Sequence, residues 1–265
     1  MGGGARGWRV RILSLGAGVQ STTLLLMAWH REIEPIDGAV FADTQWEPAA
    51  IYKHLDALTL LVSDDIPIHR VTSGSLRDDS LAKAGHIVSM PAFVLNPNGT
   101  KGQLRRQCTQ EYKLRAIKRQ VRELGATATN PAEMLIGISW DEWHRVHDSD
   151  VRYMLNVYPL IDRKMTRQDC EAWLTGHGYG IPQKSACIGC PFRSAQGWRD
   201  LTPAEREDAN QFDDSMRAVF HTRSIKGEVF LHPSLRPLRT IDFRSEQERG
   251  QLDLWSAECA GVCGV

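Results

Sequence analysis

The sequence predicts an α/β protein built on an open, mostly parallel, twisted sheet with flanking helices and a mostly helical, cysteine-bearing C-terminal region. Short apolar stretches alternate with longer helical ones through the N-terminal half, which is typical of strand–helix–strand units. The composition, with 42% hydrophobic and 24% charged residues over 265 positions, is that of a globular chain long enough to bury a large core. Most of the six cysteines cluster in the C-terminal part of the chain.

The first five predicted elements follow one another as strand, helix, strand, helix and strand. They span Val10–Leu15, Val19–Trp29, Gly38–Ala42, about Pro48 to Leu61, and Ile66–Val71. Residues 73–107 are expected to be irregular because glycine, proline and asparagine are scattered through them. A long irregular segment inside a compact domain is often a functional loop.

The later elements are predicted from apolar periodicity and from capping residues. In Gln110–Leu124 apolar residues recur at steps of three and four, and Gly125 closes the helix. The others are a buried strand, an extended segment, a helix with Thr166 as N-cap and a helix opened by a capping box: Glu133–Ile138, Val151–Leu160, Met165–Thr175, and Thr202 towards Phe220. We expect an α/β domain over residues 1–185, with the C-terminal region, residues 186–265, packed on it.

Charge is balanced over the whole chain but not within one segment. Lys and Arg together number 32, as do Asp and Glu, which disfavours a protein that coats nucleic acid with its whole surface. Between Lys101 and Arg122, eight basic residues face the single acid Glu111: Lys101, Arg105, Arg106, Lys113, Arg115, Lys118, Arg119 and Arg122. This segment is either a solvated helix face or a site for phosphate or a nucleic-acid backbone.

No stretch of the sequence predicts a membrane span or a secretory signal. The apolar runs are far shorter than the ~20 residues that cross a bilayer. The N-terminal residues lack the apolar core of an export signal. We therefore expect a cytoplasmic protein without a membrane partner.

The turn between the first strand and the first helix, Ser14–Thr22, combines glycines with hydroxyl side chains. Glycines let the backbone approach a ligand, and free amides at the start of a helix favour an anion. The turn contains neither a Walker A sequence nor a dinucleotide-binding fingerprint. On spacing alone it is either an ordinary tight turn or a site for phosphate or sulfate.

This turn resembles the pyrophosphate loop (PP-loop, S-x-S-G-G-x-D-S) of the adenine nucleotide α-hydrolase-like superfamily, and most closely its phosphoadenosine phosphosulfate (PAPS) reductase-like branch. Further segments are similar to that branch, in its own order. They are Phe41–Glu47 (D-T-G-x-E), Arg106–Lys113 (R-x-C-C-x-x-x-K), Gly137–Arg145 (G-x-R-x-D-E), Tyr158–Asp162 with Thr166–Asp169 (P-L-I-D-W-t-x-x-D), Ala186–Phe192 (G-C-x-x-C-T) and Glu258–Cys259 (E-C-G-L-H).

The resemblance covers roughly residues 10–195 and the tail, with departures at three positions. Gln20 stands where the loop has its magnesium-binding Asp, and Thr109 replaces the second cysteine of the R-x-C-C segment. Cys259 is followed by Ala-Gly-Val-Cys, without the Leu-His of the family tail.

The resemblance implies a bound adenine nucleotide, either ATP or a sulfonucleotide (PAPS or APS), with Mg2+ as a further ligand. The nucleotide-binding residues that it implies are Ser14, Gly16, Ala17, Gly18, Gln20, Ser21, Thr22, Asp43, Thr44, Arg106, Gly137, Ser139, Asp141, Glu142 and Arg145. The last three are alternatively a simple surface ion pair. The catalytic residues that it implies are Asp43, Lys113, Cys259 and Cys263.

The cysteines predict a metal or redox centre. Alone, Cys187 and Cys190 could hold zinc, form a redox dithiol or supply half of an iron–sulfur site. The resemblance favours a 4Fe–4S cluster held by Cys108 together with this pair, with zinc as the alternative and Lys113 beside the cluster sulfurs. The fourth ligand is left open: Cys263, Cys259 or neither, in which case one iron is free to carry sulfide. Cys170, in an amphipathic run, is expected in the core.

The implied chemistry moves sulfur. In one hypothesis, ATP adenylates an oxygen of a nucleic acid or metabolite, and sulfur carried on the cluster or on a cysteine displaces AMP. In a second, a thiolate of Cys259 or Cys263 attacks a sulfonucleotide and sulfite is released. In a third, the chain is a non-catalytic, nucleotide-sensing subunit of a DNA-modification or defence assembly. The first two call for a protein that donates sulfur or electrons.

Overall fold

The computed structural model describes residues 9–82, 90–220 and 226–244. Its main sheet has five parallel strands in the order β3-β2-β1-β6-β7. They are β1 (Arg11–Ser14), β2 (Gly38–Asp43), β3 (Ile68–Thr72), β6 (Ala132–Ile136) and β7 (Met154–Val157). The prediction of an open parallel α/β sheet with flanking helices is confirmed.

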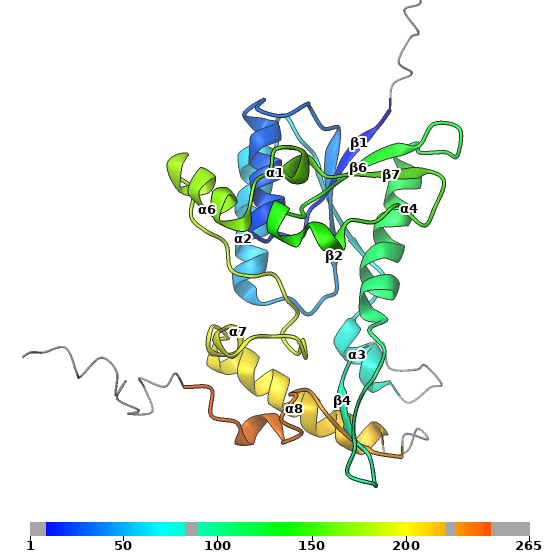
Figure 1. Cartoon of the computed structure of the whole chain (residues 1–265), viewed down its shortest axis with the longest axis vertical. Helices are drawn as coiled ribbons and strands as arrows, with labels where there is room; N and C mark the ends of the chain where they lie inside the picture. The colour runs from blue at the N-terminus through cyan, green and yellow to red at the C-terminus, as the bar shows by residue number, and fades with distance from the viewer. Residues whose placement is uncertain (1–8, 83–89, 221–225, 245–265) are drawn as a thin grey trace, which may run out of the picture.

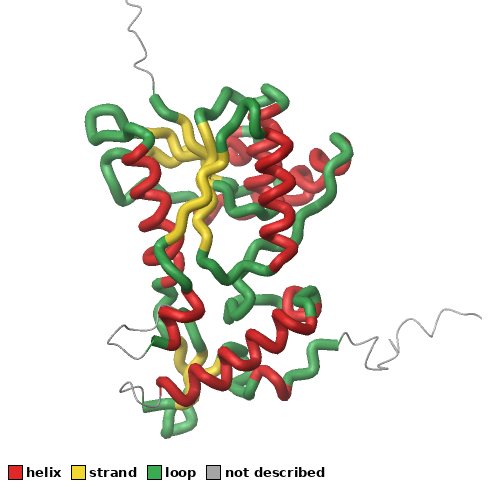
Figure 2. Tube along the Cα trace, turned by 180° about the vertical axis from the view of Figure 1, so that it is seen from behind, coloured by secondary structure: helices red, strands yellow, loops and turns green. Residues whose placement is uncertain are grey.

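Helices cover both faces of this sheet (Figures 1 and 2). Successive residues of β1 point to opposite faces, as the strand period requires. Leu13 enters a core with α1 (Val19–Trp29), α2 (Ala49–Val62) and α6 (Arg167–Gly176). Ile12 enters the core on the other face, where α4 (Arg115–Glu123) packs. The carboxyl ends of the strands are thus left between two layers of helices, which is where ligands bind in open α/β sheets.

A second body adjoins this end of the sheet (Figure 1). It contains α3 (Leu76–Leu81), α7 (Ala195–Arg199), α8 (Pro203–Phe220) and the one-turn helix η3 (Leu238–Thr240). Its antiparallel sheet has the order β5-β4-β8, formed by Lys101–Gln103, Phe93–Leu95 and Glu228–Phe230. One core joins Val94 of β4 to Phe212 of α8 and the fully buried Trp198. The boundary at residue 185 stays a prediction, since this core draws on both sides of it.

Two predicted segments differ from the structure. Residues 73–107 contain α3, β4 and β5, because β4 pairs with β8 from far along the chain and local sequence carries no sign of that pairing. The extended segment Val151–Leu160 is wrong at its end: β7 stops at Val157, and Pro159 opens the one-turn helix α5 (Pro159–Asp162). Proline favours that first helical position because its fixed φ suits it.

The predicted caps are confirmed. Thr166 caps α6 in a reciprocal box with Asp169. The amide of Thr202 donates to Glu205 at 2.9 Å, while the Glu205 amide donates back to Thr202 Oγ1 at 3.3 Å. Within the described ranges, no helix is both long enough and apolar enough to cross a membrane.

Candidate functional site

The turn after β1 is shaped to expose backbone amides. Ser14 ends β1 in the ladders to β2 and β6, and Ala17 adopts a positive φ of 54°. Ser21 Oγ accepts from the Gly16 amide at 3.1 Å and donates to the Gly18 carbonyl at 3.2 Å, which fixes the turn. Gly18 is the N-cap of α1 and provides no side-chain cap. The first amides of α1 are therefore available to an anion.

The end of β6 brings a second group of predicted residues to this turn. Gln20 Nε2 lies 3.4 Å from both Ser139 Oγ and Glu142 Oε2. Glu142, in the short helix η2 (Trp140–Arg145), also pairs with Arg145 at 2.7 Å. The structure thus places a carboxylate against the side-chain amide of Gln20. Asp141 has a different partner, since it accepts from the first amide of α6, and its bond to Ser139 helps to lower its pKa.

Gly137 is where β6 touches the helix start, and an added methyl group there should weaken nucleotide binding. A Cβ at Gly137 would lie 3.0 Å from the Ser21 amide nitrogen and 3.2 Å from its Cα. We expect Gly137→Ala to displace the first turn of α1 and to raise the Kd for adenine nucleotides by about tenfold in calorimetric titrations. Gly180→Ala is the control, because nothing lies within 4 Å of that added Cβ. Equal affinities in the two variants would contradict the predicted nucleotide site.

Asp43 ends β2 and is saturated by protein partners. Its Oδ1 accepts from the Gln45 amide at 2.7 Å and from the Tyr52 hydroxyl at 2.8 Å. Its Oδ2 accepts from Nε and NH2 of Arg70 at 2.9 and 2.8 Å. Burial, followed by the bond to Asp43, raises the pKa of Tyr52 to about 12. Asp43 therefore holds the loop after β2, where Gln45 has a positive φ of 56°.

The next residues of that loop enter a buried polar cluster. Glu47 Oε1 accepts from Lys113 Nζ at 3.2 Å and from Thr44 Oγ1 at 3.3 Å. The Cys187 thiol lies 3.2 Å from Thr44 Oγ1 and 3.5 Å from Glu47 Oε1. Burial is the largest single influence on the pKa of Lys113 and lowers it. The charge of Glu47, its hydrogen bond and the nearby cysteine sulfurs together outweigh burial, so the net shift is upward. Burial raises the pKa of Cys187, and the same carboxylate adds to that shift.

The three cysteines of the predicted centre lie in one apolar neighbourhood. Cys187 is buried in the second core, and Cys108 and Cys190 pack against it. Cys108 precedes the π-helical turn η1 (Thr109–Leu114), a distortion that is frequent at functional sites and that here carries Lys113. Across the described ranges, no three His, Cys, Asp or Glu side chains group closely enough to hold a single ion.

Arg193 is hydrogen-bonded to the backbone of the C-x-x-C turn, and the sequence analysis did not identify it. Its guanidinium donates to the carbonyls of Ala186 and Cys187 at 2.6 and 2.8 Å, and to Gly197 at 3.1 Å. In the part of the chain that the structure describes, it forms no ion pair, and burial lowers its pKa. A buried cation beside cysteine sulfurs is suited to an anionic centre.

Trp46, in the loop after β2, is hydrogen-bonded to the turn that carries Cys187 and Cys190. Its carbonyl accepts from the Ile188 amide at 2.8 Å, and its indole Nε1 donates to Asp208 of α8 at 2.6 Å. Gly189 lies against the indole so closely that no side chain fits. On the other side, Ser185 lies next to the turn after β1, because a Cβ at Gly18 would be 3.8 Å from it. The segment 185–190 therefore connects the turn after β1 with the cysteine pair.

The other predicted residues have separate surroundings. Thr22 is turned to α2, where its hydroxyl lies 3.0 Å from His54 Nε2. Arg106 is exposed and stacks over Phe192 at 5.4 Å. Cys170 is in the core as predicted, and burial raises its pKa to about 11. Cys259 and Cys263 lie outside the described residues.

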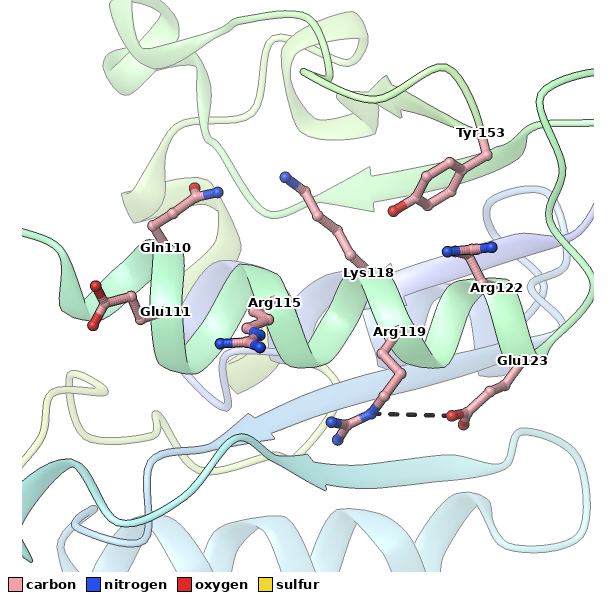
Figure 3. A pocket seen from close by; sticks show the side chains of 8 residues that line it. All are labelled: Gln110, Glu111, Arg115, Lys118, Arg119, Arg122, Glu123 and Tyr153. Atoms are coloured by element: carbon pink, nitrogen blue, oxygen red, sulfur yellow. Dashed lines mark ion pairs between the residues drawn. The ribbon is translucent and has the colours of Figure 1, made fainter. Parts of the chain in front are cut away.

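The basic segment forms the wall of a groove of about 650 Å³ on the outer side of α4 (Figure 3). Its lining residues are Gln110, Glu111, Arg115, Lys118, Arg119, Arg122, Glu123 and Tyr153. Lys118 pairs with Asp150 at 2.7 Å, and Arg119 reaches Glu123 at 4.0 Å. Arg122 lies 5.7 Å from the Tyr153 ring centre. An aromatic ring among cations suits a phosphate-bearing or aromatic ligand.

Comparison with known proteins finds a likeness in structure. No protein-family model matches the chain, and no curated protein matches it. Among solved structures, it is similar to a phosphoadenylyl-sulfate (PAPS) reductase from Candida auris in its phosphate complex. The identity is 10% and the TM-score 0.41, over 67% of this chain and 76% of that chain. The interpretation of the site therefore rests on its own residues.

Proposed function

We propose that the chain is a sulfur-transferring enzyme of the PAPS reductase-like branch, with an adenine nucleotide at Ser14–Thr22 and an iron–sulfur cluster on Cys108, Cys187 and Cys190. The observation that carries the proposal is a juxtaposition. Ser185 lies against Gly18 of the PP-loop, while Cys187, two residues further on, contacts the Thr44 hydroxyl. The same short segment thus faces both proposed sites.

The nucleotide part of the proposal assigns a role to each element of the turn. The first amides of α1 would bind phosphate oxygens, because they have no helical acceptor. Gln20 would contribute an amide where ATP-splitting relatives have a carboxylate. Glu142, 3.4 Å from that amide, is the carboxylate that could bind Mg2+ with ATP.

The three cysteine sulfurs are of the ligand type that binds an iron–sulfur cluster. Three thiols are soft ligands that select iron–sulfur clusters or zinc. A cluster places each thiolate on a different iron, so it does not require all three thiols around a single ion. Lys113 and Arg193 bring positive charge to the same neighbourhood. When bound, such a cluster supplies a site for sulfide or for electrons, and zinc remains the alternative metal.

The groove of Figure 3 supports a nucleic acid as the sulfur acceptor. It runs along η1 and α4 from Gln110 to Glu123, and η1 also carries Lys113. An anionic strand in the groove would therefore be led towards the cysteines. Sulfur or electrons would come from a separate donor protein.

The metal is tested by anaerobic purification of the full chain with iron, sulfide and zinc analysis. We expect a brown protein with iron and sulfide, because thiolate-to-iron charge transfer absorbs visible light. Changing Cys108, Cys187 or Cys190 to Ser should remove most of the iron, since each supplies a direct ligand. Cys170→Ser is the matched control, being a buried thiol in another core. Stoichiometric zinc without iron would contradict the cluster and leave a structural zinc site.

The reaction is tested on the same preparation. ATP-dependent release of pyrophosphate in the presence of a nucleic acid would support thiolation. Release of sulfite from a sulfonucleotide with thioredoxin would instead identify a reductase that uses Cys259 or Cys263. Tight nucleotide binding without turnover would identify the nucleotide-sensing subunit.

A further inference from the structure

Glu47 is a fully buried carboxylate with one unused oxygen. Its side chain has no exposed surface. Its side-chain contacts with the described residues converge on Oε1, which faces Lys113 Nζ, Thr44 Oγ1 and Cys187 Sγ. Within the described residues, Oε2 has no hydrogen-bond partner although it is buried. A buried carboxylate oxygen without a donor or cation is unfavourable, so its presence indicates a missing partner.

The bonds to Oε1 resemble those around a ligating carboxylate. Carboxylates that bind metals are themselves hydrogen-bonded by surrounding groups, which fix their orientation. Here Lys113 and Thr44 hold one oxygen and leave the other free. The ion pair with Lys113 accounts for Oε1 but not for Oε2, which is buried without a hydrogen-bond partner among the described residues.

The position of Glu47 next to a cysteine points to what the missing partner is. Cys187 Sγ is 3.5 Å from Oε1, and Cys190 lies on the same turn, where its amide donates to the Cys187 carbonyl at 3.1 Å. Arg193 holds the carbonyls of this turn and leaves the sulfurs to other partners. A group bound by Cys187 would therefore be formed beside the carboxylate of Glu47.

We propose that Glu47 is the fourth protein ligand of the metal centre, through Oε2, alongside Cys108, Cys187 and Cys190. This inference rests on the proposed function and deepens it. The three thiols lose their protons on binding, which leave to solvent, and Glu47 binds as the carboxylate. Oε1 keeps its bonds to Lys113 and Thr44. The tail cysteines, Cys259 and Cys263, are then not needed to complete the centre.

The test compares Glu47→Gln with Cys259→Ser and Cys263→Ser in the full chain, purified anaerobically with 57Fe. We expect Glu47→Gln to lose iron to a chelator at least about tenfold faster than the wild type. The wild-type Mössbauer spectrum should contain a component for an iron with an oxygen ligand, and this component should be absent from Glu47→Gln. Both tail variants should retain iron like the wild type.

A second variant guards against a folding defect. Glu47→Gln leaves the Lys113 ammonium without its carboxylate, whereas Glu47→Gln with Lys113→Met removes both charges together. If the double variant melts like the metal-free wild type and still loses the oxygen-ligated component, the ligand assignment is supported. Thr44→Val is the control for loss of one bond to Oε1, and it should keep the component.

The outcomes separate this inference from the proposed function. If the wild type holds neither iron nor zinc, both fail. If it holds a cluster that Glu47→Gln retains unchanged, only the inference on Glu47 fails and a buried water accounts for Oε2. Loss of iron in a tail variant would likewise overturn it, by identifying that cysteine as the fourth ligand.

Discussion

Gly189→Ala should unfold at a markedly lower temperature and fail to load metal. A Cβ at this position would lie 2.1 Å from Cη2 of Trp46, with two further ring carbons within 2.9 Å. The indole cannot yield, because its nitrogen bonds to Asp208 and its ring packs on Phe212 at 4.5 Å between ring centres. We expect a loss of about 2–3 kcal/mol in the free energy of unfolding, the upper part of the range for overpacking.

Thermal melts of the metal-free protein and iron analysis measure the two parts of this effect. Gly176→Ala is the matched control, because nothing lies within 4 Å of its added Cβ. Adding Trp46→Leu to Gly189→Ala makes room for the methyl group, so part of the stability should return even though the bond to Asp208 is lost. A double-mutant cycle gives that coupling directly. Wild-type melting of Gly189→Ala would show that the turn does not lie against the indole.

The sequence was sufficient for the parallel sheet and for the residues at its carboxyl edge. Alternation of strands and helices has a local signal, and the helix Val19–Trp29 has the predicted bounds. Topology then brings the end of β1 beside β6, so Gln20 meets Ser139 although 119 residues separate them in sequence. Motif order predicted this neighbourhood, because the motifs Ser14–Thr22 and Gly137–Arg145 lie at the ends of adjacent strands of the same sheet.

The sequence did not predict the second sheet or the supports of the cysteine turn. β4 and β8 have three residues each, too few to show a period, and they pair over a long chain distance. Arg193 donates to backbone carbonyls of segment 185–190, and Trp46 accepts from the Ile188 amide of the same segment. Both contacts exist only because of the path that this segment takes in the folded chain. No spacing rule marks such contacts. Glu47 lay within a recognised motif, but its free oxygen is a property of its neighbours.

Asp43→Ala should lower the stability of the protein even in the absence of a nucleotide. The sequence alone placed Asp43 at the nucleotide, and its four accepted bonds give it a structural role as well. Its side chain is 8% exposed and that of Arg70 is 47% exposed. Solvent screens the ion pair, but the Gln45 amide and the Tyr52 hydroxyl also lose their acceptor. We expect a loss of about 2–3 kcal/mol in the free energy of unfolding.

Two measurements separate this structural role from nucleotide binding. In Asp43→Ala the pKa of Tyr52 should fall from about 12 while staying above its ordinary value, because burial remains when the carboxylate is gone. Ultraviolet titration of the folded variant reads this directly. Asp43→Asn keeps an oxygen for Gln45 and Tyr52 but removes the charge, so it should fold better than Asp43→Ala.

If Asp43→Asn binds ATP and sulfonucleotides with wild-type Kd, Asp43 acts only by holding the loop that carries Thr44 and Glu47. A weaker Kd in that folded variant, with Arg70→Met binding like the wild type, would show that the carboxylate itself contacts the nucleotide.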